Sequence, residues 1–366
     1  MNTVSGPARV ALILLSILCL PVQALCAGDA GSSCADHGVL KTGISQFYFE
    51  SRMSYGFTSV GGEVVDPSCG FKGEYLNLRL DGQICDGLTY SYRQRLNKNT
   101  NATFFDSTDW LHLDWKVTPR LSLSAGKQVV AIGGYEYDRA PIDLYFCSEF
   151  WNNIPCYQMG VSATYNVTGH DQLLLQLCNS PMRSWSGNNK YALNLMWYGS
   201  HGWWETMWSA NAIQWGNGNI YYLALGNRFN ITDWLRWDVD LMDRYNPMGY
   251  IGEDYSVMTE LSAAVGERMR IHSKFTYDYH HDSSRYHSDC DMIDFLVCSR
   301  TKLKSFSAGI EGYPLRGGSD FLKVFAVGGY RWGRNGDTID VPVVVDDFQL
   351  QIGIKFRLDI LRSAIR

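Results

Sequence analysis

Hydrophobic and polar residues alternate along most of this 366-residue chain. In residues 348–356 every second residue is hydrophobic, and residues 111–117 repeat the pattern. A period of two is typical of β-strands whose two faces meet different surroundings. The pattern therefore predicts a chain built mainly of strands.

Sixteen segments show this alternation, and most of them are 8 to 12 residues long. A tilted strand needs about that length to cross a bilayer. The segments are 46–55, 72–80, 88–96, 108–117, 121–128, 157–166, 171–179, 191–199, 203–214, 219–229, 233–243, 255–264, 269–280, 303–312, 321–331 and 347–356.

The connections between these segments alternate in length. Those that follow odd-numbered segments are mostly eleven residues or longer, whereas those that follow even-numbered segments are mostly three to eight. An outer-membrane barrel has short turns at one end and long loops at the other, and a sheet in lipid must close to satisfy its backbone. We therefore expect an all-β fold, a transmembrane up-and-down antiparallel β-barrel of sixteen strands with short periplasmic turns and long extracellular loops.

The composition supports a barrel when residues on the two faces of the predicted strands are counted separately. Aromatic residues make up 14% of the chain and charged residues 19%. The apolar face carries no charged residue away from the strand ends, and several of its rings lie near those ends, where aromatic girdles sit. A soluble sandwich also alternates, but it would gather its rings in mid-strand. The formal net charge of −5 argues against a nucleic-acid partner.

The N-terminus has the pattern of an export signal. Arg9 precedes an apolar run that ends near residue 20, and small residues lead up to Ala24. We expect cleavage after Ala24, with cleavage after Ala27 as the alternative. The predicted organisation is a signal peptide (1–24), a short periplasmic segment (25–44), the transmembrane barrel (45–356) and a C-terminal periplasmic extension (357–366).

Four arginines face the lumen from the first three segments: Arg52, Arg79, Arg93 and Arg95, with only Glu50 expected opposite them. Adjacent strands lie about 4.8 Å apart, so these side chains would form one basic patch that lines the pore. Such a patch attracts anions and suits carboxylate or phosphate. The alternative is a network in which the arginines pair with acids across the barrel.

The longest connection, residues 129–156, is apolar and rich in aromatic rings. A loop of this length in an ordered domain is usually functional. We expect it to fold into the lumen as a constriction loop, with Glu136, Asp138, Arg139 and Asp143 at the narrowest point. The alternative is that it packs outside the barrel or at a subunit interface.

Three stretches carry a family resemblance: LSLSAGKQ at 121–128, GGYEYDRAPIDLY at 133–145 and WNNIPCYQMGVSATY at 151–165. They resemble the phosphate-selective porin O and P family, most specifically over about residues 108–166. The resemblance implies a sixteen-stranded barrel in the outer membrane of a Gram-negative bacterium, commonly a trimer, whose loop-narrowed pore passes small anions. Gly126, Lys127 and Gln128 form the strand-end motif that corresponds to the family.

These features predict an outer-membrane porin that allows passive diffusion of small hydrophilic solutes and favours anions such as phosphate. The alternative is a non-conducting barrel that binds or adheres through its long loops. The expected partners are small solutes, outer-membrane lipid and further copies of the chain in a homotrimer.

Cysteines and histidines add no expected cofactor. Cys147 with Cys156, and Cys290 with Cys298, are close enough in sequence to staple a long loop, and free thiols are the alternative. The chain has no CxxC pair for zinc and neither a GxSxG nor an HExxH motif. We therefore expect no metal site, no catalytic residue and no enzyme activity.

Overall fold

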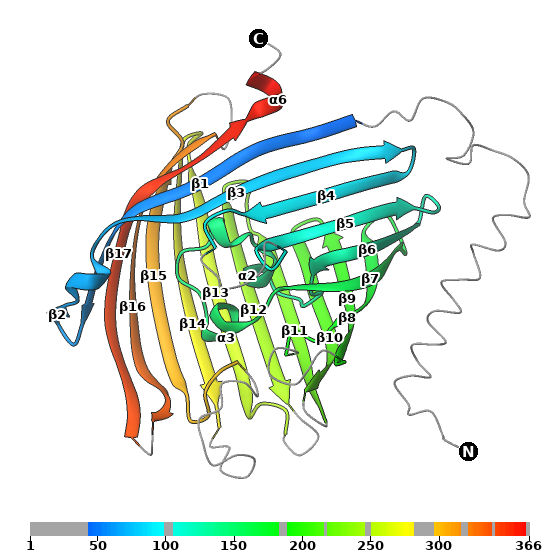
Figure 1. Cartoon of the computed structure of the whole chain (residues 1–366). Helices are drawn as coiled ribbons and strands as arrows, with labels where there is room; N and C mark the ends of the chain where they lie inside the picture. The colour runs from blue at the N-terminus through cyan, green and yellow to red at the C-terminus, as the bar shows by residue number, and fades with distance from the viewer. Residues whose placement is uncertain are drawn as a thin grey trace, which may run out of the picture. The chain divides into compact units, whose positions relative to one another are not determined.

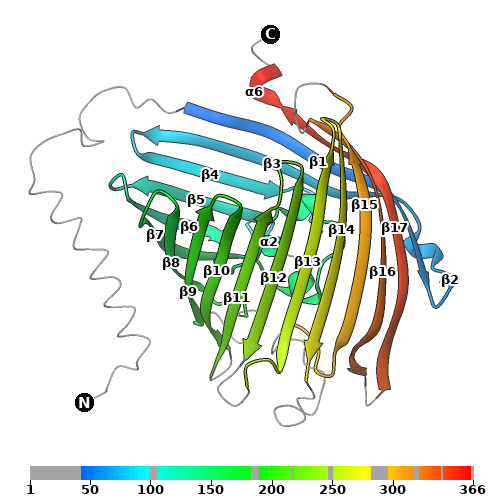
Figure 2. The same cartoon turned by 180° about the vertical axis from the view of Figure 1, so that it is seen from behind.

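A closed antiparallel β-barrel forms the body of the molecule (Figures 1 and 2). The computed structural model describes residues 43–98, 105–182, 189–215, 218–245, 250–281, 296–315, 321–338 and 341–363. β1 (Gly43–Val60) pairs on one side with β3 (Gly70–Cys85) and on the other with β17 (Val341–Asp359), which closes the ring. The short β2 (Glu63–Val64) pairs with only two residues of β1, so sixteen strands form the wall and one is extra.

The remaining strands follow one another around the barrel, each antiparallel to the next. They are β4 (Leu88–Arg95), β5 (Thr108–Lys116), β6 (Leu121–Val129), β7 (Tyr157–Asn166), β8 (Asp171–Asn179), β9 (Tyr191–His201), β10 (Trp204–Trp215), β11 (Gly218–Asn230), β12 (Leu235–Tyr245), β13 (Asp254–Val265), β14 (Met269–His280), β15 (Lys302–Gly312) and β16 (Leu322–Thr338).

All sixteen predicted strands are present, and the predicted fold class is confirmed. β7, β8 and β14 have the bounds that the alternation predicts. The last hairpin is longer, because β16 ends at Thr338 instead of 331 and β17 begins at Val341 instead of 347. The sequence hides this extension because a register shift between Arg334 and Asp337 interrupts the alternation.

Strand register explains the alternating pattern. Phe275, Phe306, Tyr330 and Phe348 lie side by side in one row across β14 to β17. Phe306 is 49% exposed and Tyr330 42%, whereas Ser305 and Ser307, the sequence neighbours of Phe306, are buried on the opposite face. An apolar outer face beside lipid and a polar inner face are what a transmembrane barrel requires.

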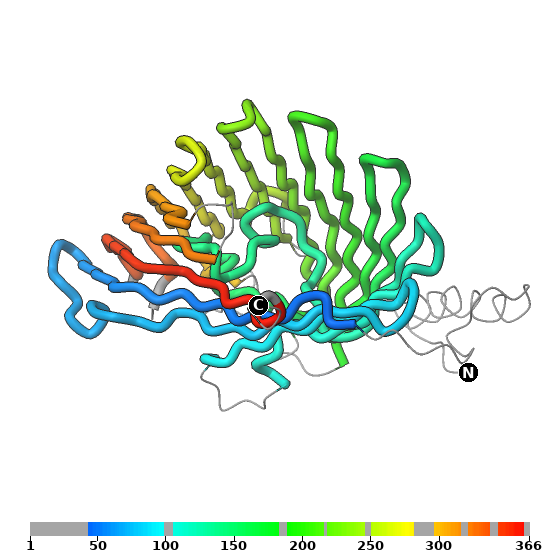
Figure 3. The backbone as a smooth tube through the Cα atoms, turned by 90° about the horizontal axis from the view of Figure 1, so that it is seen from above, coloured from blue at the N-terminus to red at the C-terminus, as the bar shows by residue number. Residues whose placement is uncertain are grey.

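The described helices are all short: η1 (Asp66–Ser68), α2 (Tyr135–Asp138), η2 (Pro141–Asp143), α3 (Glu149–Asn153) and α6 (Ile360–Ser363). None of the helices in the described residues is long and apolar enough to cross a membrane. α2, η2 and α3 belong to the segment between β6 and β7, and Figure 3 shows that segment inside the ring of strands. The constriction loop therefore lies within the lumen, as expected.

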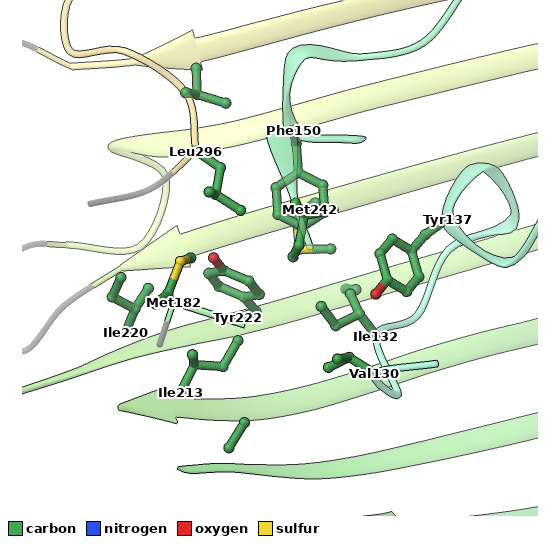
Figure 4. Close-up of a cluster of buried hydrophobic side chains, with 14 of the residues drawn as sticks. Val130, Ile132, Tyr137, Phe150, Met182, Ile213, Ile220, Tyr222, Met242 and Leu296 are labelled. Atoms are coloured by element: carbon green, nitrogen blue, oxygen red, sulfur yellow. The ribbon is translucent and has the colours of Figure 1, made fainter. Parts of the chain in front are cut away.

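An apolar core inside the barrel holds the constriction loop on one side (Figure 4). Val130, Ile132 and Phe150 of the loop are 0%, 1% and 4% exposed. The wall residues that meet them include Ile213, Ile220, Tyr222 and Met242. On this side of the lumen the loop therefore replaces water against the wall, and the inner face of the wall is apolar there.

The cysteines of the constriction loop do not form a disulfide. Cys147 and Cys156 are free, so for them the free-thiol alternative holds. Burial raises the pKa of the Cys147 thiol to about 12, which keeps it protonated and unreactive. Cys298 is disulfide-bonded, but Cys290 and the predicted signal peptide lie outside the described residues.

Candidate pore constriction

The constriction loop enters the lumen through a turn fixed by Asp240 of β12. The Asp240 carboxylate accepts hydrogen bonds from the backbone N–H groups of Tyr135 and Glu136, at 2.9 and 2.7 Å. These N–H groups belong to the first turn of α2, where they have no helical partner. Gly134 just before them has φ of 110°, which favours glycine. The first turn of the loop is therefore anchored to the wall.

Arg139 anchors the loop to β12 and β13. Its guanidinium donates to both carboxylate oxygens of Glu260, at 2.7 and 2.8 Å, and to Asp238 at 2.9 Å. Both acids are buried, with side chains 7% and 1% exposed. Bidentate pairing of this kind fixes orientation as well as charge. Arg139 thus serves as a clamp rather than as a free cation in the pore.

Two acids of the loop pair with lysines of the wall. Asp143 lies 3.4 Å from the Lys323 ammonium and also pairs with Lys355. Burial would raise the pKa of Asp143, but the two lysines hold it below its usual range. Glu136 lies 2.5 Å from the Lys274 ammonium, which also donates to the Phe146 carbonyl. Glu136 and Asp143, two of the three acids of the expected constriction, are therefore neutralised by the wall.

Arg52 holds the loop from the side of β1. Its guanidinium donates to the carbonyls of Ile142, at 3.0 Å, and of Leu144. It also pairs with Glu74, which in turn accepts a hydrogen bond from Ser54. The loop is consequently fastened to walls on both sides of the lumen.

Two cavities meet at Arg139 and Asp143. The first, which we call the charged cavity, has a volume of about 250 Å³. It contains five basic and three acidic residues: Arg139, Arg236, Arg270, Lys274, Lys323, Asp143, Glu260 and Glu311.

The second, which we call the ring-lined cavity, has a volume of about 380 Å³. It also contains five basic and three acidic residues: Arg79, Arg93, Arg139, Lys355, Arg357, Glu50, Asp138 and Asp143. Its rings are Tyr48, Trp110, Tyr137, Trp151 and Tyr157. Of the four residues expected at the constriction, the exposed Asp138 lines the ring-lined cavity, and Arg139 and Asp143 line both cavities. Glu136 lines neither cavity and lies behind the other three.

The four arginines expected as a basic patch do share one region of the wall, but they are not opposed by Glu50 alone. Arg79 lies 2.8 Å from Asp81, and Arg93 and Arg95 share Asp109 at 3.1 and 3.3 Å. That part of the expectation is wrong. Asp81 lies beyond the predicted strand end at residue 80, and Glu74, the partner of Arg52, stands at a register shift.

Arginines and rings alternate along the wall of the ring-lined cavity. The Arg357 guanidinium lies 3.6 Å from the centre of the Tyr48 ring, and Arg79 lies 5.9 Å from that ring and 5.4 Å from Trp110. The Arg93 guanidinium lies 4.6 Å from the centre of the Trp110 ring. Such contacts fix the planes of the guanidinium groups without neutralising them. Arg357 was expected in the C-terminal extension, but it belongs to β17, which ends at Asp359. Arg357 was therefore missed as a residue of the pore because the last strand is longer than predicted.

The strand-end motif positions the start of the constriction loop. Gly126 has φ of 133°, and a Cβ there would lie 2.3 Å from the Leu111 carbonyl oxygen. The Gln128 side chain accepts from Ser162 at 2.9 Å, and the Lys127 ammonium donates to the Phe105 carbonyl at 3.0 Å. Lys127 lines neither cavity. Its contacts therefore order the strand and a neighbouring loop.

A closed sixteen-stranded barrel with an inner loop fastened across its lumen defines the class of outer-membrane porins. The fold is similar to the anion-selective porin from Comamonas acidovorans, with a TM-score of 0.61 and 10% identity over 87% of this chain and 100% of that one. It is also similar to the outer membrane channel DcaP of Acinetobacter baumannii, with a TM-score of 0.57 and 11% identity over 90% and 100% of the chains. At these identities the likeness concerns the fold.

Part of the sequence also matches a family model. Residues 47–202 match the model of the phosphate-selective porin O and P family, which confirms the resemblance. No curated protein matches the chain. The match over these residues and the barrel fold together support a porin channel of the outer membrane.

Proposed function

We propose that this porin passes small hydrophilic solutes by passive diffusion and favours anions, phosphate among them. The observation that carries the proposal is the charge of the two cavities, each of which holds five basic residues and three acidic ones. A lumen lined by an excess of one sign raises the local concentration of the opposite ion.

The excess comes from arginines that no acid compensates. Arg270 of the charged cavity and Arg357 of the ring-lined cavity form no ion pair within the part of the chain that the structure describes. Two acids of the loop, Glu136 and Asp143, are by contrast paired with lysines, whereas Asp138 is exposed in the ring-lined cavity. An anion that enters therefore meets guanidinium groups without an acidic partner, whereas the Asp143 carboxylate between the two cavities already pairs with two lysines.

The constriction loop supports a size limit in this proposal, with Asp138, Arg139 and Asp143 at its narrowest part and Glu136 buried behind them. The loop occupies the lumen and is fastened to both walls, so solutes have to pass beside it. Replacing residues 133–153 by a short Gly–Ser linker should raise single-channel conductance. Unchanged conductance would remove the constriction from the proposal.

Planar-bilayer recordings test the pore itself. Purified protein should form ohmic channels whose reversal potential in a KCl gradient lies toward that of chloride, and phosphate should carry current. A barrel that inserts but does not conduct would instead be a surface-binding protein, and a cation-selective reversal potential would refute the anion preference.

We also propose that the chain works as a homotrimer in outer-membrane lipid and that it has no catalytic activity. Phe71 supports the assembly, since it is 91% exposed on β3 beside the Tyr55 ring at 5.3 Å. On the outer face such a ring meets either lipid or a neighbouring subunit, and the following experiment distinguishes the two. Cross-linking in native membranes should give a trimer that Phe71→Ser weakens, and a monomer in the unaltered protein would refute it.

A further inference from the structure

One row of side chains runs along the wall of the ring-lined cavity, and we call it the arginine–ring row. It consists of four residues on four successive strands of the wall, each of which is the direct register partner of the next: Tyr48 of β1, Arg79 of β3, Arg93 of β4 and Trp110 of β5. Direct partners on antiparallel strands lie about 5 Å apart. The row therefore places two guanidinium groups side by side between two aromatic rings.

The arginine–ring row stands where two cavities meet. Arg79 and Trp110 line the ring-lined cavity and also a third cavity, which has a volume of about 480 Å³. The third cavity is lined further by Thr89, near the start of β4, and by Asp114, near the end of β5, both at the short-turn end of the barrel. A solute that leaves the ring-lined cavity through the third cavity consequently passes the row.

Some rings of the ring-lined cavity carry cations and others do not. The Tyr48 ring is 4% exposed, and the guanidinium groups of Arg357 and Arg79 lie 3.6 and 5.9 Å from its centre. Trp151 of α3 and Tyr157 of β7 also line the cavity and are half-buried. Among the described residues, no cation lies over either of these two rings. The cavity therefore offers a solute both cations and aromatic surface.

Arg357 is the cation without an acidic partner in this cavity. Its register partner Glu50 is buried, and the Glu50 carboxylate accepts a hydrogen bond from the Asn77 amide at 3.0 Å. Arg79 donates its Nε–H to Asp81 at 2.8 Å, but the Arg79 side chain is still 35% exposed. A carboxylate in the cavity thus meets two guanidinium groups beside one ring, one without an acidic partner and one half-exposed.

We propose that the ring-lined cavity binds aromatic carboxylates, such as benzoate, on their way through the pore. The inference rests on the proposed anion preference and names a class of solute for it. The carboxylate pairs with Arg357 and Arg79, because a guanidinium presents its donors in one plane that matches a carboxylate. The ring of the solute packs against the rings of the cavity. A volume of about 380 Å³ lies in the range of small-molecule sites, about 300 to 1,000 Å³.

The rings favour an aromatic acid over an aliphatic acid of the same charge. Contact between two aromatic rings contributes about fivefold in affinity beyond the burial of apolar area. Cyclohexanecarboxylate has the same charge and ring size as benzoate and gains the burial, but it lacks that contribution. The ratio of the two affinities therefore reports on the rings and not on charge.

Blockade of current in planar bilayers tests the proposal. Benzoate or cyclohexanecarboxylate is added to channels of the purified full-length protein in KCl at neutral pH, and the concentration that gives half-maximal loss of conductance is measured for each acid. Benzoate should block the unaltered channel at a concentration about fivefold lower. The reversal potential of the same channels in a KCl gradient reports the anion preference separately.

Two variants remove one ring each from different elements: Trp110→Leu from the wall and Trp151→Leu from the constriction loop. Each should reduce the preference for benzoate while chloride remains the favoured ion. Trp151 also packs against the apolar core that holds the loop. A change seen with Trp151→Leu alone would therefore reflect movement of the loop and would count against the proposal.

Three charge variants separate this site from the rest of the lumen. Arg357→Gln should weaken blockade by both acids by about tenfold, since it removes a charged hydrogen-bond donor. Arg270→Gln is the matched control, because it removes a cation of the charged cavity and should lower the chloride preference while the preference for benzoate stays. Asp138→Asn removes the exposed acid of the ring-lined cavity and should strengthen blockade by both acids equally.

Equal blocking concentrations for the two acids in an anion-selective channel would overturn this inference and leave the proposed function standing. A cation-selective or non-conducting barrel would overturn both.

Discussion

Asp143 offers a direct test of how the constriction sets selectivity. It lines both cavities and pairs with Lys323 and Lys355. The substitution Asp143→Asn keeps the shape of the side chain and removes one negative charge. The two lysines then lose their common partner and add to the positive charge of the lumen, so the anion preference should rise.

The size of the effect follows from Coulomb's law. One unit charge acts on an ion about 8 Å away in water with about 0.5 kcal/mol. Removal of that charge therefore favours an anion by about twofold and disfavours a cation by the same factor. The ratio of anion to cation permeability should increase by about fourfold at low salt, where screening is weak.

Reversal potentials in a tenfold KCl gradient measure this permeability ratio. The control variant Lys355→Gln removes a positive charge and should lower the ratio. The lysines hold the pKa of Asp143 below its usual range, so the carboxylate stays ionised at neutral pH. A group with a depressed pKa loses its stabilising pair only as the pH falls through that pKa. Acidification to a pH below the usual pKa range of aspartate should therefore raise the anion preference of the unaltered channel toward that of Asp143→Asn. An Asp143→Asn channel with unchanged or lower anion preference would refute the reasoning.

Three further predictions concern the constriction loop and its charge. Arg139→Gln leaves the buried Glu260 without its bidentate partner and should lower the unfolding free energy by about 3 kcal/mol, measured by urea titration in detergent; unchanged stability would contradict the clamp. Phe150→Ala should cost about 3 to 5 kcal/mol and increase conductance, because it empties the apolar core that seats the loop. Anion preference should fall as salt rises from about 0.01 to 1 M, since the Debye length shrinks from about 30 to 3 Å, and a salt-independent ratio would point to size rather than charge.

The barrel could be predicted from the sequence because its signal is local. Strand alternation and turn residues lie within ten or so neighbouring positions, and lipid on one side with water on the other enforces the period of two. β7 and β14 accordingly have the bounds that the pattern gives. The length and ring content of residues 129–156 also sufficed to expect a loop inside the lumen.

The pairing within the constriction could not be predicted, since it depends on contacts between distant segments. Asp143 meets Lys355 across the closure of the barrel, and Arg139 meets Glu260 from another strand. The acid that pairs with Arg52 stands at a register shift, where the alternating pattern assigns no face. The apolar core around Ile213 and Met242 likewise depends on contacts between the constriction loop and strands far from it in sequence.

The reversal potential of single channels in a KCl gradient tests the central claim most directly. The excess of basic residues in both cavities predicts a potential displaced toward the chloride equilibrium value, and further displacement for Asp143→Asn. A potential displaced toward the potassium value would contradict the account.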